Sequence, residues 1–331
     1  MRAAGGGEFP PDKVPLLRRA LRLEWLSVVY FLSAITFTAL VMGQSQAMKT
    51  AWVDDILGLV PPIAVLIAAR VRRRSPSTAY PYGYHRCVTI AFLVAAVSLL
   101  ALGLLLLVEN GRSLVEARHP TIGMVEVLGH PIWLGWLMLA ALLWSGVPTI
   151  FLGRAKDRLA RKLHDKALLS DALMNKADWM SGLAAVLGVL GVGLGYWWTD
   201  AVAAIVIAAD ITHDGWKNLQ CVIADLLDRK PRLVDDDGWD PLPENLERAL
   251  ERLPWVQHAT VRLRENGHVF FGEADIVPVD EAEPLRRVRE ARAVAHALDW
   301  RLKDLCIQLV DEHEGEPQEQ PGSFAPPHAP S

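Results

Sequence analysis

The 331-residue chain has few cysteines and no strong excess of charge of either sign. Its three cysteines, Cys87, Cys221 and Cys306, are far apart and form no Cys-x-x-Cys pair, which argues against a disulfide scaffold and against a zinc finger. The formal net charge of −4 gives no indication of a nucleic-acid partner. The chain also has no nucleophile–base set and no glycine-rich phosphate loop, so an enzyme is the least favoured class of function.

Apolar residues are abundant: they make up 51% of the chain, and the mean hydropathy is +0.20. They are bunched into runs close to the 20 or so residues that a membrane-spanning helix needs. We predict six transmembrane helices, at residues 24–43, 46–69, 87–108, 131–153, 168–195 and 199–220. Pro61 and Pro62 predict an interruption or a kink in the second of them.

Lysine and arginine are concentrated in three segments on one side of the predicted bundle. The leading segment 1–22 and the connections after the second and fourth runs are rich in them, whereas the third-to-fourth loop holds only Arg112 and Arg118. The positive-inside rule therefore places both termini in the cytoplasm. The leading segment lacks a cleavable signal pattern, because its basic residues precede a span-length apolar run. We predict a multi-pass protein of the inner (plasma) membrane.

Beyond Asp228 the pattern becomes that of a soluble domain. Leucines at helical spacing predict a helix over 242–253, and "WVQHATVRLRENGHVFFGEADIVPV" predicts two strands around an Asn266-Gly267 turn. A second amphipathic helix follows, and "LCIQLVDE" predicts a third strand. The expected fold class is thus an α-helical membrane bundle with a cytoplasmic α/β domain of ferredoxin-like αββαβ type. The predicted parts are an N-terminal segment at 1–22, a bundle at 23–228, the αββαβ domain at 240–313 and a disordered tail at 314–331.

The fifth apolar run begins with "SDALMNKADWMSG", residues 170–182, which places polar groups where a bilayer disfavours them. Asp171, Met174 and Asp178 have the spacing i, i+3 and i+7, which predicts one shared helix face. Two carboxylates and a thioether directed into a bundle can bind a divalent cation. The alternative is that they cap or orient a helix near the interface, and this alternative suits Asp171 better than the deeper Asp178.

The second run carries Asp54 and Asp55, which point about 100° apart because they are adjacent on a helix, so only one of them can face a given partner. Lys49 and Lys176 are candidates to balance the buried acids, since an unpaired charge in a membrane is costly. For Lys49 the alternative is a side chain that reaches out to the outer interface.

The six runs, the acids in the second and fifth of them, and the αββαβ domain together resemble the cation diffusion facilitator transporters over roughly residues 20–313. "SDALMNKAD" looks like that family's fifth-span Asp-x-x-His-x-x-x-Asp pattern. "YPYGYHR" is similar to its second-to-third loop, and "DLLDRKP" to its exit from the sixth span. The resemblance implies a dimeric antiporter that moves divalent metals out of the cytoplasm against protons. It also implies a transport site of two residues on the second span and two on the fifth.

Residue by residue, Asp178 matches the family's fifth-span aspartate, whereas Met174 stands where the family usually has histidine. Asp54 aligns with the first ligand on the second span, and Gly58 occupies the place of the second acid. The four-ligand set is therefore incomplete, and the residues that would fill it are Asp55, Asp171 or Asn175.

The second metal site that many members build from loop histidines is not expected, because Tyr80 and Tyr84 occupy the matching places. In the soluble domain no spacing selects a metal site, and we expect its histidines to be ordinary surface residues. The candidates considered there are His258, His268, Asp275, His296 and His313.

We therefore expect a secondary transporter that exports a divalent metal cation by alternating access, with protons replacing the metal on the return. Asp54 and Asp178 would be core ligands, assisted by Asp171, Met174 and Asp55. No cofactor is expected besides the transported ion, for which zinc, manganese, iron and cobalt are the candidates. A thioether ligand would favour softer ions, and carboxylate and amide oxygens would favour manganese or magnesium. The expected partners are the lipid bilayer and a second copy of the chain, joined through the soluble domain.

Two alternatives stay open at this point. Lys49 and Lys176 favour a monovalent cation as the substrate, because fixed positive charges lower the need for a second positive charge on the ion. The incomplete ligand set favours a metal sensor that has no flux and whose spans only anchor a ligand-reading domain.

Overall fold

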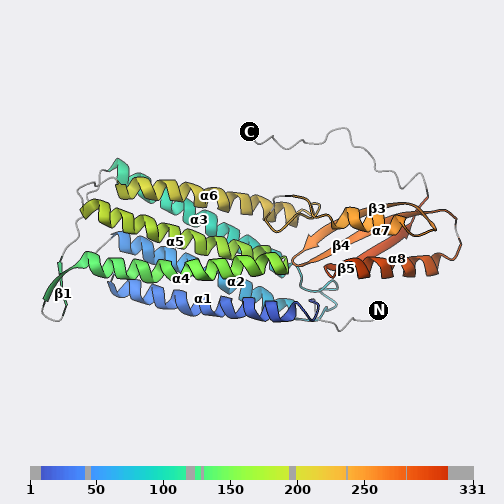
Figure 1. Ribbon diagram of the computed structural model, residues 1–331, viewed down its shortest axis with the longest axis horizontal. Coiled ribbons are helices and arrows are strands. Elements are labelled where there is room, and N and C mark those ends of the chain that lie inside the picture. Colours follow the sequence, from blue (N-terminus) through green and yellow to red (C-terminus); the bar gives the residue numbers. More distant parts are fainter. Residues whose placement is uncertain are drawn as a thin grey trace. The chain divides into compact units, whose positions relative to one another are not determined.

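The computed structural model describes residues 9–41, 46–116, 124–127, 130–193, 199–235, 238–280 and 282–311. Six long helices form the first part of the chain (Figure 1). They are α1 (Val14–Val41), α2 (Gln46–Arg72), α3 (Cys87–Val115), α4 (Leu134–Leu163), α5 (Lys166–Gly193) and α6 (Thr199–Leu226). Each predicted run falls on one of these helices. By length and composition alone, two segments of the described chain are apolar enough to cross a membrane, Val14–Leu40 and Cys87–Val115.

Two local predictions differ from the structure. α2 continues through Pro61 and Pro62, so the predicted interruption is wrong and the kink stays a prediction; prolines are tolerated where neighbouring helices satisfy the freed backbone groups. The fourth run begins later than predicted, because two short antiparallel strands precede α4: β1 (Met124–Val127) and β2 (His130–Trp133). Pro131 disfavours a helical conformation of His130, which gives a local reason for the extended backbone there.

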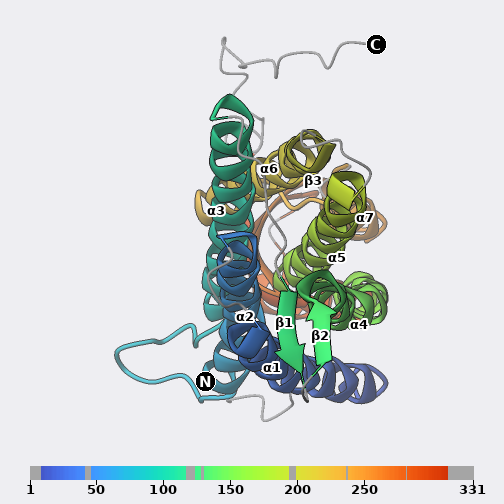
Figure 2. The same ribbon diagram turned by 90° about the vertical axis from the view of Figure 1, so that its left-hand side faces the viewer.

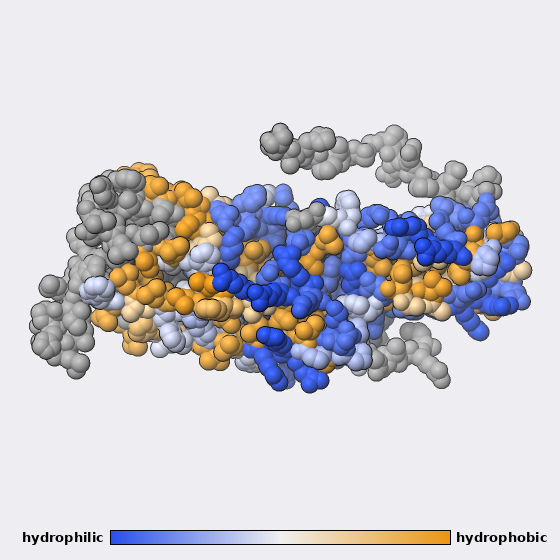
Figure 3. All heavy atoms as spheres, in the orientation of Figure 1, coloured by the Kyte–Doolittle hydropathy of each residue, from blue (hydrophilic) through white to orange (hydrophobic). Residues whose placement is uncertain are grey.

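The helices pack as neighbours in a bundle, which Figure 2 shows from one end. α3 packs most extensively on α6 and α4 on α5, while α1 contacts both α2 and α4. Glycine allows a close approach of α3 and α6, since a Cβ atom on Gly215 would lie 2.6 Å from the backbone of Leu100. In the space-filling view, apolar side chains gather over the half of the bundle nearer to β1, and hydrophilic ones over the opposite helix ends (Figure 3).

The remaining elements occur in the predicted order αββαβ: α7 (Leu242–Glu251), β3 (Val256–Asn266), β4 (Val269–Pro278), α8 (Pro284–Leu298) and β5 (Leu302–Leu309). β4 lies between β3 and β5 and runs parallel to β5. The turn lies one residue later than predicted: Asn266 is the last residue of β3, and Gly267 and His268 connect it to β4, with a φ of +70° at Gly267. Leu246, Phe270 and Ile276 lie fully buried in a core that the two helices and the sheet share. The ferredoxin-like class remains a prediction.

The chain forms two compact units, and the boundary between them passes through the β3–β4 hairpin. Its tip, Glu265–Val269, belongs with the helical unit, whereas Asp240–Arg264 and the residues from Phe270 onward form the second unit. The tip therefore contributes side chains to the helical unit.

Candidate cation site between the second and fifth helices

Asp178 of α5 faces α2 at a glycine. A Cβ atom on Gly58 would lie 3.4 Å from Oδ2 of Asp178 and 2.8 Å from Cε1 of Phe31. Phe31 is itself buried, with Tyr30 and Leu152 as neighbours. The lack of a side chain at Gly58 thus lets the Asp178 carboxylate and the Phe31 ring approach α2 closely, and it places that carboxylate in the α2–α5 interface.

Asp54 lies one helical turn before Gly58. Residues four apart share a helix face, so position 54 belongs to the face of α2 that meets Asp178. The side chains of Asp54 and Lys49 lie outside the described residues, and the roles predicted for them stay predictions.

Asp55 is directed toward other helices. Its Oδ1 accepts a hydrogen bond of 2.6 Å from Ser145 Oγ of α4, and its Oδ2 accepts one of 3.0 Å from Thr38 Oγ1 of α1. The side chain is 4% exposed. Both carboxylate oxygens are therefore engaged by hydroxyl groups, which gives Asp55 a part in joining α1, α2 and α4.

Asp171 lies in a separate, fully buried ionic cluster. Nζ of Lys156 on α4 is 2.6 Å from Oδ2 of Asp171 and 3.2 Å from Oε2 of Glu24 on α1. All three side chains are 0% exposed. Asn175 donates a hydrogen bond of 2.8 Å to the backbone carbonyl of Asp171, and its Nδ2 lies 3.4 Å from Oδ1 of Asp171.

Met174 is buried among hydrocarbon. Its 0% exposed side chain belongs to an apolar cluster with Leu99 and Leu102 of α3 and Ile211 of α6. The three residues predicted to share one face of α5 thus have three different environments: an ionic cluster at Asp171, an apolar cluster at Met174 and the α2 interface at Asp178. The apolar surroundings argue against a thioether ligand beside Asp178.

Lys176 pairs with acids of α6. Its Nζ lies 3.0 Å from Oδ2 of Asp210 and 3.2 Å from Oδ2 of Asp214. The side chains of Lys176 and Asp210 are 41% and 48% exposed. Lys176 therefore balances partly exposed acids of the sixth helix, whereas the sequence pattern led us to consider it for the buried acids of the second and fifth.

No three His, Cys, Asp or Glu side chains gather in the way a metal ion requires anywhere in the described part of the chain. Since the side chain of Asp54 is not described, the arrangement offers one carboxylate, that of Asp178, which lies against the α2 face on which a second acid is expected. Two carboxylates from facing helices can neutralise a divalent cation in a low-dielectric interior.

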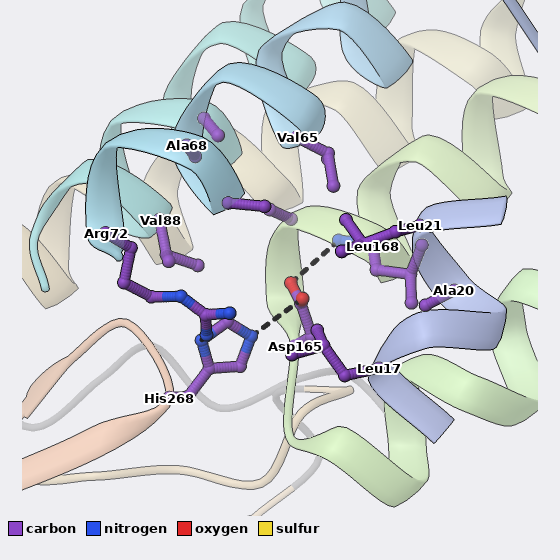
Figure 4. A pocket seen from close by; sticks show the side chains of 13 residues that line it. Leu17, Ala20, Leu21, Val65, Ala68, Arg72, Val88, Asp165, Leu168 and His268 are labelled. Atoms are coloured by element: carbon purple, nitrogen blue, oxygen red, sulfur yellow. Dashed lines mark hydrogen bonds and ion pairs between the residues drawn. The ribbon is translucent and has the colours of Figure 1, made fainter. Parts of the chain in front are cut away.

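A second polar region lies at the basic ends of the helices, where the hairpin tip contributes His268 (Figure 4). Nη1 of Arg72 is 2.9 Å from Nδ1 of His268, and Nε2 of His268 is 2.7 Å from Oδ2 of Asp165. A guanidinium only donates, so Nδ1 accepts and Nε2 carries the proton that Asp165 accepts. His268 is 2% exposed, so the expectation that it is a surface residue is wrong.

Asp165 also caps α5 by accepting a hydrogen bond of 3.0 Å from the backbone N–H of Leu168. Burial alone would raise the pKa of Asp165, but His268, the Leu168 N–H and the nearby Arg72 guanidinium hold it below its ordinary value. These residues border a cavity of about 20 Å³, lined otherwise mainly by apolar side chains of α1, α2, α3 and α5.

Lys166, the first residue of α5, joins the same region to α6. Its Nζ lies 2.8 Å from Oδ2 of Asp225 and 2.8 Å from Oε2 of Glu265, and the three side chains are nearly fully buried. Burial would raise the pKa of Glu265, but the adjacent Lys166 charge and the contact with His164 lower it. The hairpin tip is therefore held to the helix ends by charge-assisted hydrogen bonds.

The other candidates in the soluble domain are dispersed. His258 is exposed and forms an ion pair of 3.0 Å with Glu251, His296 is exposed, and Asp275 pairs with Arg262 at 3.1 Å. His313 lies outside the described residues.

Glu24 and Lys156 are among the polar residues that the sequence analysis did not single out, as are Asp165, Asp225 and Glu265. Lys156 lies in the basic segment after the fourth predicted run, yet it shares one face of α4 with Thr149 and Gly153, both small residues. Glu24 lies on the buried face of α1 between Ala20 and Ser27. The signal available in the sequence was a charged residue that shares a helix face with small residues.

The model of the cation efflux transmembrane domain family matches residues 25–227. The manganese efflux system protein MneS of Bacillus subtilis is 28% identical over 185 residues, which cover 56% of this chain and 60% of that protein. The probable cation efflux system protein Rv2025c of Mycobacterium tuberculosis is 25% identical over 289 residues, covering 86% of this chain and 79% of that protein.

Metal tolerance protein 10 of Arabidopsis thaliana is 26% identical over 270 residues, which cover 80% of this chain and 57% of that protein. The matched part of this chain thus spans less than two thirds of the length of MneS and of metal tolerance protein 10.

Proposed function

Because this chain belongs to the cation efflux family, we propose that it exports a divalent metal cation from the cytoplasm in exchange for protons. One observation carries the site: the Asp178 carboxylate lies against Gly58, on the face of α2 that also holds position 54. We propose Asp54 and Asp178 as the core ligands, one from each of two helices that pack on each other. Their two negative charges would offset the charge of the ion inside the membrane.

The other acids predicted as helpers are left out of the proposed ligand set. Asp171 is neutralised by Lys156 at 2.6 Å, and both oxygens of Asp55 accept hydrogen bonds from hydroxyl groups. The buried apolar position of Met174 excludes it from the set as well. Backbone or side-chain amide oxygens and water would complete the coordination shell.

Manganese is the proposed first substrate. A ligand set of carboxylate and amide oxygens suits Mn²⁺ better than it suits softer ions, and MneS is named as a manganese efflux protein. Zinc, iron and cobalt are the ions to compare.

The proposed orientation has both termini in the cytoplasm of a cell whose plasma membrane holds the bundle. It is supported by the basic residues at one set of helix ends, among them Arg72, Arg161 and Lys166. A homodimer formed through the second unit completes the proposal.

Flux through the full-length protein in phospholipid vesicles tests the proposal. Vesicles loaded with a metal-sensitive dye should report Mn²⁺ entry for the wild type, and Asp178→Asn and Asp54→Asn should each reduce the initial rate by about 100-fold or more, since losing a ligand costs at least as much as losing an outer-shell partner. Asp157→Asn, at an exposed site on α4, is the matched control and should retain the rate. Undiminished Mn²⁺ flux in both site variants would refute the ligand assignment.

The same vesicles separate the two alternatives. Flux of Na⁺ or K⁺ without flux of any divalent ion would establish the monovalent transporter. Binding of Mn²⁺ without any flux would establish the sensor.

A further inference from the structure

The buried cluster of Glu24, Lys156 and Asp171 contains one more ionisable acid than base. Both carboxylates contact the same ammonium group, at 3.2 Å and 2.6 Å, and all three side chains are 0% exposed. One lysine neutralises only one carboxylate. A second ionised carboxylate in a fully buried place would carry a large desolvation cost without a compensating partner.

Polar atoms without hydrogen-bond partners occur close to this cluster along α1 and α5. Among the buried side-chain oxygens of the described residues that make no hydrogen bond, four belong to Glu24 or to neighbours of Glu24 and Asp171 on these helices: Glu24 Oε1, Ser27 Oγ, Ser170 Oγ and Asn175 Oδ1. Ser27 lies three residues after Glu24 on α1, and Ser170 and Asn175 lie next to and one turn after Asp171 on α5. Buried polar atoms are rarely left unsatisfied, so their accumulation here indicates a site that takes up a further hydrogen-bonding group.

The groups that face Glu24 are few. Lys156 comes from α4 and Asp171 from α5, while α2, the other helix packed on α1, brings no charged side chain of the described residues into hydrogen-bond contact with Glu24. The charge of the cluster is thus set by these three residues. The shorter contact belongs to Asp171, which makes it the carboxylate that Lys156 neutralises.

We propose that the cluster is a proton-binding site, in which Glu24 carries a proton while Asp171 is paired with Lys156. The site is distinct from Asp178. The cluster joins α1, α4 and α5, so a movement of α5 that brings Asp171 away from Lys156 and into contact with water would leave the ammonium to pair with Glu24. Asp171 would then stay ionised in water, and the Glu24 proton would be released to solvent. This inference rests on the proposed function: the Glu24 proton is the one exchanged for the cation. The residues that couple proton movement to cation movement are then different from those that hold the metal.

Infrared spectroscopy of the purified full-length protein tests the proton directly and without reference to transport. A protonated carboxylic acid has a carbonyl stretch separate from that of a carboxylate, and it shifts in D₂O. The wild type at neutral pH should show this band, and Glu24→Gln should lose it. Asp171→Asn should lose it too, although Glu24 is still present, because Glu24 then pairs with Lys156 in its ionised form.

The matched control is Glu273→Gln in β4, whose side chain is 51% exposed and whose replacement should leave the band unchanged. Both cluster variants remove the surplus acid, so we expect them to fold and to unfold at temperatures no lower than the wild type. Lack of the band in the wild type, or its persistence in either cluster variant, would overturn the proton site.

A transport measurement tests the coupling separately. In vesicles, Glu24→Gln should carry Mn²⁺ down its own gradient but no longer respond to an imposed pH gradient. A response equal to that of the wild type would overturn the coupling role. Lack of any Mn²⁺ flux in the wild type would count against the proposed function, and the infrared result would still decide the proton site.

Discussion

Asp171 and Asp178 are seven residues apart on one helix, yet their surroundings differ in every respect that matters for binding a cation. Asp171 contacts a lysine that no solvent reaches, and the side chains around it come from α1 and α4. Asp178 meets a glycine of α2. The buried ammonium neutralises Asp171, whereas the Asp178 carboxylate lies against the face of α2 that also holds position 54.

The largest effect on stability is expected from a change in the surroundings of Asp171. Lys156→Met leaves two acids in a fully buried place and should lower the free energy of unfolding by about 3–5 kcal/mol, which thermal unfolding in detergent would measure. Lys162→Met, at an exposed position of the same helix, should change it by less than about 0.5 kcal/mol. Adding Glu24→Gln and Asp171→Asn to Lys156→Met should recover most of the loss. Equal destabilisation by the two lysine variants would show that the cluster is not the ionic centre described above.

The surroundings of Asp178 are tested by adding a side chain at Gly58. Gly58→Ala would put a Cβ atom 2.8 Å from the Phe31 ring, and the overpacking should cost about 1–3 kcal/mol and weaken Mn²⁺ binding by moving α2 away from α5. Gly111→Ala is the control, since no atom lies within 4 Å of its Cβ position. That change should leave Mn²⁺ binding as it is. A Gly58→Ala protein with unchanged stability and unchanged binding would contradict the close packing of α2.

The comparison extends to the two buried acids that pair with Lys166 at the basic ends of the helices. Glu265→Gln removes one of two carboxylates from Lys166 and should cost about 1–3 kcal/mol, toward the lower end because Asp225 stays at 2.8 Å. Hydrogen exchange of residues 265–269 should become faster in this variant. Slower or unchanged exchange would mean that the hairpin tip is held by other contacts.

The smallest effect is a dependence on pH. The pKa of Asp165 is held below its ordinary value of 3.8, so the stability it contributes is fully present above that value and is lost as the pH falls through the lower folded-state pKa. Unfolding temperatures of the wild type should therefore fall more steeply below about pH 4 than those of Asp165→Asn. If the unfolding temperatures of the two proteins changed with pH in parallel, Asp165 would not contribute to the pH dependence of stability.

The six helices could be predicted because each is an apolar run of about the length that a membrane-spanning helix needs, although by length and composition only Val14–Leu40 and Cys87–Val115 of the described residues are apolar enough to cross a membrane. The four-residue strands β1 and β2 carry too little pattern to be recognised in this way. The order αββαβ was also predictable, from leucine spacing and the Asn-Gly turn, although β5 begins at Leu302, three residues earlier than expected.

The partners of the charged residues were less predictable. Helical spacing placed Asp171, Met174 and Asp178 together, and the structure separates them because each meets a different neighbouring helix. The contact of Glu24 with Lys156 joins residues 132 positions apart, and no local pattern encodes such a pair. His268 was predicted to be a surface residue for the same reason. Its acidic partner, Asp165, lies far away in the sequence, in the α4–α5 connection.

Equilibrium binding of Mn²⁺ to the purified full-length protein, measured by titration calorimetry, tests the central distinction most directly. The account predicts that Asp171→Asn binds Mn²⁺ with an affinity close to that of the wild type, whereas Asp178→Asn binds it about 100-fold more weakly or not at all. Loss of binding in Asp171→Asn together with retained binding in Asp178→Asn would contradict it.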